Sequence, residues 1–115
     1  MTKANVTAEQ NTNNALMRYK QREKDERSIR AIMATETGRW FITRLLDATG
    51  INAKSFTGNS ETFYREGKRA IGIHVLRQIE SLGLDGLKLK QQAEMEYANQ
   101  QIEWLTLINQ KKDEQ

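Results

Sequence analysis

The chain has 115 residues, a formal net charge of +3, and 37% hydrophobic against 29% charged residues. This length allows one domain at most, and the low hydrophobic content predicts one modest core that does not order both ends by itself. The absence of cysteine excludes disulfides, thiolate metal sites and thiol nucleophiles, and without proline only glycine can break a helix. No apolar run is long enough to span a membrane, and the N-terminus lacks a signal-peptide core. We therefore expect a protein made and retained in a cytoplasm.

The charges are unevenly distributed. Residues 39–77 carry seven basic and three acidic side chains, whereas the chain from Gln78 onward carries four basic and seven acidic ones. This asymmetry suits contact with DNA, head-to-tail contacts between copies, or an acidic partner equally well.

The first third of the chain predicts an arm and a polar helix. Residues 1–12 are rich in Asn, Thr and Gln and are expected to form an extended or flexible arm. Residues 13–34 favour helix, but no apolar side chain falls between Tyr19 and Ile29. A helix that is polar all round is either solvated and held by charge pairs, or laid against a partner.

A helical hairpin is predicted over residues 35–83. Its first helix, over 35–49, has Thr35 or Thr37 as its N-cap and Gly50 as its stop. A loop follows, and a second helix runs over 60–82. Two glycines inside this second helix predict close approach of another backbone, or alternatively a kink. The residues expected to pack the hairpin are Trp40, Phe41, Leu45, Phe56, Phe63, Tyr64, Gly67 and Gly72.

Residues 84–115 predict a last long helix that starts near Asp85 or Gly86, after Gly83 ends the hairpin. We expect the two flanking helices to be too polar to fold alone and to need neighbours. The expected fold class is all-α, a central helix-turn-helix hairpin flanked by long polar helices and an extended N-terminal arm. The large apolar residues expected to share one side of the last helix are Leu87, Met95, Ile102, Leu105 and Ile108.

No constellation of catalytic residues is present in the sequence. His74 is the single histidine, and no carboxylate lies three or four residues from it. The segment 55–60, Ser-Phe-Thr-Gly-Asn-Ser, could present backbone N–H groups to an anion at the start of the helix. It lacks the Gly-Lys-Ser/Thr of a phosphate-binding loop, so we expect a turn followed by a helix cap instead. We expect no enzymatic activity, metal site, cofactor or small-molecule substrate.

A basic surface over the hairpin is the one candidate site. It would contact DNA, through release of counterions from the phosphates, or a protein partner. Alternatively, Arg65 and Arg69 pair with nearby glutamates, and Glu61 stands in a favourable i,i+4 orientation to Arg65. The candidates, which Lys54 would adjoin, are Arg39, Arg44, Arg65, Lys68, Arg69 and Arg77.

The central segment also carries a family resemblance. A Gly38-Arg39 helix with Leu45-Leu46 and a Gly50 stop is followed by a Phe-Thr-Gly-Asn turn at 56–59, by Glu-Gly-Lys-Arg at 66–69, and by Gly72. Over about residues 36–82, this pattern resembles a small family of tailed-bacteriophage proteins typified by a protein of a Bordetella podophage. The resemblance implies a phage-encoded protein, often from near head and tail structural genes, and it brings no activity or site residues.

With that origin, we expect a non-enzymatic virion structural or assembly protein of a short-tailed phage. It would pack in several copies at the head interior, the portal vertex or an internal ejection assembly. Its partners would be portal, capsid or ejection proteins and copies of itself, with DNA as a further contact, and its location the virion. The alternatives are a phage nucleic-acid-binding accessory protein and an early protein that binds a host factor.

Overall fold

The computed structural model describes residues 3–51 and 61–114, and side chains from residue 7 onward. These residues form four helices and, within the same ranges, no strand, so the all-α prediction is confirmed. The expected turn and cap at 55–60, together with Lys54 and Phe56, lie outside the described residues. The helices are α1 (Lys3–Met33), α2 (Glu36–Ala48), α3 (Glu61–Glu80) and α4 (Leu84–Glu114).

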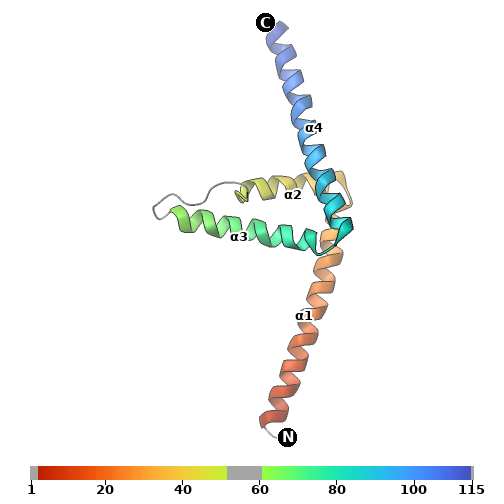
Figure 1. Ribbon diagram of the computed structural model, residues 1–115, viewed down its shortest axis with the longest axis vertical. Coiled ribbons are helices and arrows are strands. Elements are labelled where there is room, and N and C mark those ends of the chain that lie inside the picture. The colour runs from red at the N-terminus through yellow and green to blue at the C-terminus, as the bar shows by residue number, and fades with distance from the viewer. Residues whose placement is uncertain (1–2, 52–60, 115) are drawn as a thin grey trace.

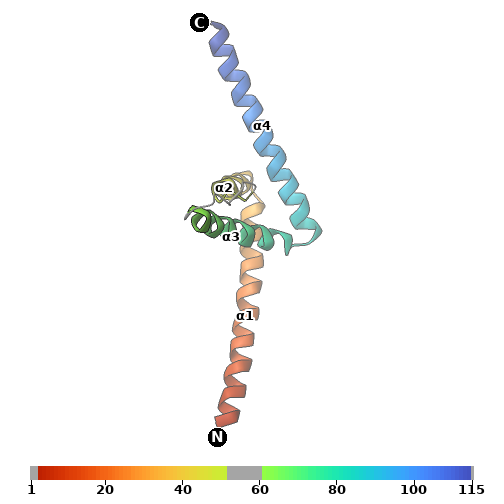
Figure 2. The same cartoon turned by 60° about the vertical axis from the view of Figure 1, so that its left-hand side comes forward.

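The four helices meet at one junction and diverge from it. Helices α1 and α4 project in opposite directions along the long axis, while α2 and α3 lie side by side across it (Figures 1 and 2). The principal extents are 82 × 40 × 20 Å, and the radius of gyration is 20.9 Å. A compact domain of this length would have a radius of gyration of about 13 Å. Much of the chain therefore lies outside any shared core.

The core sits at this junction, and every helix contributes to it. Met33 at the end of α1 and Ile79 near the end of α3 are the most deeply buried large side chains. Because all four helices supply core residues, the α2–α3 hairpin is completed by both long helices. The buried members are Ile29, Met33, Ile42, Ile79, Leu82 and Ala93, with Leu46, Val75 and Leu89 packed against them.

The ends of α2 follow the predicted capping residues. Thr35 is extended, and its Oγ1 accepts a hydrogen bond from the Gly38 amide at 3.1 Å. Gly50 follows the helix with φ of 67°, and Gly83 ends the hairpin with φ of 68°. Both glycines are in the left-handed region that a Cβ disfavours, which is why the chain turns at these points.

Two other glycines build the corners between consecutive helices. Gly38, the third residue of α2, lies so close to α1 that a Cβ there would stand 1.7 Å from the carbonyl oxygen of Ile32. Gly86, the third residue of α4, would place a Cβ 2.0 Å from the carbonyl oxygen of Ile79 in α3. At both corners the new helix thus packs directly onto the penultimate residue of the helix before it.

The N-terminal arm was predicted wrongly, because α1 is helical from Lys3 through the expected arm of residues 1–12. No glycine or proline occurs before Gly38. Asn, Thr and Gln each cost a helix no more than about 0.7 kcal/mol relative to alanine, so nothing in this segment ends the helix.

The expected packing of the hairpin needs a second correction. Phe41, Phe63 and Tyr64 are exposed, Phe63 by 82%, and a Cβ on Gly67 would meet no described atom within 4 Å. The buried face of α2 instead runs through Arg39, Ile42 and Thr49. The buried face of α2 differs from the predicted one because the prediction relied on the large aromatic side chains, and these do not all face the core.

Gly72 makes a close approach, but to side chains and not to the backbone that was predicted. It is buried, and a Cβ there would stand 2.2 Å from Oγ1 of Thr49, which follows α2. The absence of a side chain on Gly72 thus makes room for the Thr49 side chain. Trp40 and Leu45 are half-buried.

We predict that Gly38→Ala lowers the free energy of unfolding by at least about 2 kcal/mol, because the added methyl group overlaps the backbone of α1, which cannot rotate away. Gly67→Ala is the matched control. It should raise the free energy of unfolding by about 0.5–1 kcal/mol through helix propensity alone. Urea denaturation followed by circular dichroism measures both. Equal stabilities of the two variants would contradict the corner geometry.

Candidate interaction surfaces

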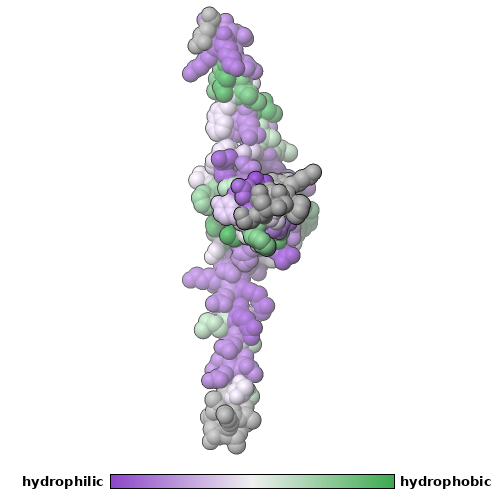
Figure 3. Space-filling view, turned by 90° about the vertical axis from the view of Figure 1, so that its left-hand side faces the viewer, coloured by the Kyte–Doolittle hydropathy of each residue, from purple (hydrophilic) through white to green (hydrophobic). Residues whose placement is uncertain are grey.

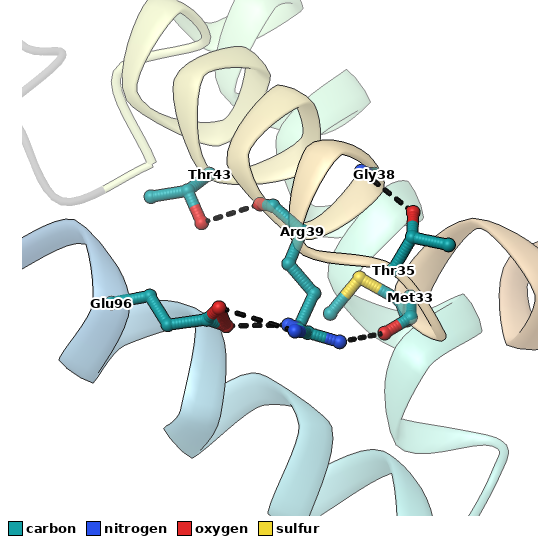
Figure 4. Close-up of polar contacts among 6 residues, drawn as sticks. All are labelled: Met33, Thr35, Gly38, Arg39, Thr43 and Glu96. Carbon is teal, nitrogen blue, oxygen red and sulfur yellow. Dashed lines mark hydrogen bonds and ion pairs between the residues drawn. The ribbon is translucent and has the colours of Figure 1, made fainter.

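Arg39 is the most constrained charged residue of the described chain. Arg39 is only 7% exposed. Its guanidinium donates two hydrogen bonds to the carboxylate of Glu96 in α4, a fork formed by Nε with Oε1 at 2.5 Å and by Nη2 with Oε2 at 3.1 Å (Figure 4). Its Nη1 donates to the carbonyl oxygen of Met33 at 3.0 Å. One side chain of α2 thereby holds α4 and also satisfies a carbonyl at the end of α1.

The hydrogen bonds to Glu96 raise the pKa of Arg39, while burial opposes them. An arginine is already charged at any ordinary pH, so the ion pair keeps its positive member throughout. Arg39 was predicted to belong to a basic surface, and that assignment is wrong because the side chain is buried and paired. A local signal was present: Arg39 shares its helix face with Ile42 and Leu46, three and seven residues on.

A cluster of three aromatic rings makes a second connection between α2 and α4. The ring of Trp40 lies 5.2 Å from that of Tyr97 and 5.7 Å from that of Trp104, the latter edge-on at 85°. Arg44 Nη1 also donates to the Tyr97 hydroxyl at 3.3 Å. Glu96 and Tyr97 were not predicted as contact residues from the sequence. Their partners in α2 are more than 50 residues away, and the spacing of residues within one helix does not reveal contacts with so distant a segment.

The basic candidates on α3 make contacts within the chain. Arg65 pairs with Glu61 at 3.3 Å, as the alternative interpretation predicted, and Lys68 lies over the ring of Tyr64. Arg69 Nε donates to the carbonyl oxygen of Ile51 at 3.3 Å, joining α3 to the end of α2.

Arg44 and Arg77 are exposed but lie on different helices. Arg44 adds a 3.4 Å contact with Asp47 to its bond with Tyr97. Arg77 lines a crevice between α1 and α3 that also contains Glu23 and Glu26. Acidic neighbours thus accompany most of the positive charges, which weakens attraction to a phosphate backbone.

The described residues offer little to acid–base or metal chemistry. His74 is exposed, and its Nε2 lies 3.4 Å from the amide nitrogen of Gln78. Within residues 3–51 and 61–114, no three His, Asp or Glu side chains are placed to hold a metal ion. A groove of about 320 Å³ has core residues such as Ile42 and Ile79 in its wall and Asp47, Lys90 and Glu94 among its polar lining. Such a groove can receive a side chain of a partner.

A series of exposed large apolar side chains follows α4 away from the junction. The hydrophobic side chains of this helix alternate with polar ones above the junction, while α1 below it is mainly hydrophilic (Figure 3). Ile102, Trp104, Leu105, Leu107 and Ile108 are between 47% and 62% exposed. None of the helices in the described part of the chain is long and apolar enough to cross a membrane.

The sequence predicted which large apolar residues share one side of α4, but it did not predict which side meets the core. The core contacts come from Gly86, Leu89 and Ala93, whereas Leu87, Met95, Ile102, Leu105 and Ile108 are exposed. Small residues that allow helices to approach closely carry a weak hydrophobic signal, so the large aliphatic side chains concealed the core face.

Comparison with known proteins gives one match. The family model described as Bbp19-like phage protein matches residues 29–94, more than half of the chain. The matched segment is wider than residues 36–82, and it adds the end of α1 and the first turns of α4. It begins at Ile29 and ends one residue after Ala93, so it contains every buried hydrophobic residue of the core. No curated protein and no solved structure matches the chain.

We predict that Glu96→Gln lowers the free energy of unfolding by about 1.5–3 kcal/mol, since it leaves the buried Arg39 guanidinium without its counter-charge. Glu94→Gln, on the same helix, removes only an exposed i,i+4 contact with Lys90 at 3.8 Å. It should cost less than about 0.5 kcal/mol. Chemical denaturation of both variants measures the difference. Similar small losses would show that the Arg39 fork contributes nothing to the junction.

Proposed function

Because the chain belongs to the Bbp19-like phage proteins, we propose that it is a non-enzymatic structural or assembly protein of a short-tailed phage virion. It packs in several copies at the head interior, the portal vertex or the internal ejection assembly. Its partners are other virion proteins and further copies of the same chain. The phage family supplies the origin, and the form of the molecule supports the role.

The long helices support a role that depends on neighbours. Side chains 7–28 of α1 are all exposed except Glu23, which is half-buried, and side chains 101–114 of α4 are exposed throughout. Isolated helices gain little stability from their own hydrogen bonds, and most helices in proteins rely on tertiary packing. Two projecting helices of this length thus present extended surfaces that suit contact with other chains.

A single observation carries the proposal: the exposed apolar end of α4. Between Ile102 and Ile108, five large apolar side chains point in most directions around the helix, interrupted by Glu103 and Thr106. A helix segment that is apolar on nearly every side is normally buried in a core or an interface. In an assembly of many chains, this end of the molecule would be enclosed.

Contact with DNA receives less support from the arrangement of charges. Arg39 is buried, and Arg44, Arg65 and Arg69 each make an intramolecular contact. Protein-protein contact is therefore the function that the described surfaces favour. Binding to a host factor would use the same apolar end of α4, and the test below separates it by location.

We predict that mass spectrometry of purified phage particles or of their assembly precursors detects this protein in several copies per particle. In phage that lack the gene, a complementing copy with Leu107→Asp and Ile108→Asp should be incorporated at less than about a tenth of the wild-type level, because two charges enter a buried contact. The control is Gln101→Asp with Gln110→Asp, which adds the same charge at exposed polar positions.

Both variants should keep wild-type circular dichroism, because all four positions are exposed. Absence of the wild-type protein from mature and immature particles alike would reject the proposed function. Recovery of the protein with a host enzyme instead would assign it to the early proteins.

A further inference from the structure

Helix α4 has a second apolar face, separate from the one that meets the core. Of its five large members, Leu84, Met95, Ile102 and Leu105 are 58–66% exposed, and Leu87 is 48% exposed. Ala98 is exposed between them. The stripe follows α4 through most of its length, and nothing in the described part of the chain covers it. We call it the outer stripe; it consists of Leu84, Leu87, Met95, Ala98, Ile102 and Leu105.

The outer stripe lies opposite the core. Leu84 and Ile102 each stand nine residues from the buried Ala93. At about 3.6 residues per turn, nine residues make two and a half turns, which brings a side chain to the far side of the helix. The opposite side of α4 already contacts α2, since Arg39 binds Glu96 and Trp40 packs on Tyr97 there. The outer stripe is consequently left for another molecule.

The spacing along the outer stripe is that of a helix-packing seam. Its members follow one another at intervals of three and four residues, once Gln91 is counted in the same row. Such intervals place apolar side chains in one row along the helix, and a second helix with a similar row can pack against it. Between Tyr97 and Gln110 the only charged residue is Glu103, so the row runs through a nearly uncharged part of the helix.

We propose that the outer stripe is where a second copy of this chain binds, with α4 packed against α4. The proposal deepens the proposed function, since it names the surface through which copies pack. Two copies placed stripe to stripe bring few like charges together between Tyr97 and Gln110, where Glu103 is the only charged residue.

The available area fits a weak, reversible contact between two copies. The five large members of the outer stripe are 48–66% exposed. Together with the flanking residues, their burial in a paired α4 would remove on the order of several hundred Å² on each chain, which is below the ~800 Å² per partner of a standard interface and in the range of weak complexes. Because α4 projects clear of α1 (Figures 1 and 2), its outer side is open along the helix.

The chain contains no cysteine, so one introduced thiol reports on one position. Ala98 faces its own copy in a parallel pair and faces Gln91 in an antiparallel pair of the same stripe. We expect purified Ala98→Cys, alone or mixed with Gln91→Cys, to form a disulfide-linked dimer readily under mild oxidation. The control Glu103→Cys, which is exposed but turned away from the stripe, should cross-link at least about tenfold more slowly.

A second measurement follows the assembly without cysteine. Light scattering on the wild-type protein at micromolar to hundred-micromolar concentrations should give a mass above that of one chain. Ile102→Glu should weaken self-association at least roughly 100-fold, since it buries a charge in an apolar contact. Gln92→Glu adds the same charge to an exposed position on another side of α4 and should leave self-association unchanged.

A monomer at every concentration, or cross-linking of Ala98→Cys, both alone and mixed with Gln91→Cys, no faster than that of Glu103→Cys, would overturn the inference. So would equal effects of Ile102→Glu and Gln92→Glu. These measurements use purified protein, so their failure is distinguishable from failure of the proposed function, which depends on the composition of the particle. A stable dimer that is absent from particles would reject the function and keep the interface.

Discussion

The fork between Arg39 and Glu96 is the contact on which the arrangement of the helices depends. The hydrophobic core has six buried members, and of these only Ile42 belongs to α2 and only Ala93 to α4. A guanidinium that binds a carboxylate with two hydrogen bonds, and the Met33 carbonyl with a third, accepts only a narrow range of positions. Moving α4 away from α2 would leave this buried guanidinium without its counter-charge, which is costly.

The two glycine corners convert that fixed junction into a molecule with opposed arms. Gly38 rests on the Ile32 carbonyl and Gly86 on the Ile79 carbonyl, each at the third position of its helix. Both the α1–α2 corner and the α3–α4 corner therefore place a glycine against a backbone carbonyl of the preceding helix. From these corners, α1 and α4 leave the junction in opposite directions. Arg30 adds an ion pair to Asp85 at 3.1 Å, which connects the two corners directly. The arms are long, but their points of departure are rigid.

Features that depend on local chemistry could be predicted from the sequence, and features that depend on pairing across the chain could not. The cap at Thr35 and the stop at Gly50 follow from the conformations that a few adjacent residues prefer, and both are present. The burial of Arg39 depends on Glu96, which lies far along the chain, so the basic surface was misassigned. No core face of α4 was predicted, because close packing there uses Ala93 and other small residues, which contribute little hydrophobic signal.

The limits of the family match divide this molecule into the junction and the parts of α1 and α4 that project from it. Residues 29–94 hold the core and both glycine corners, whereas most of α1 and the exposed end of α4 fall outside the match. Arg39 lies within the match and Glu96 two residues beyond it, so the ion pair bridges the common junction and the arm. An arm held by such a bridge can change its outer surface without disturbing the junction. The contacts that distinguish one assembly from another are then expected on the arms, where the outer stripe lies.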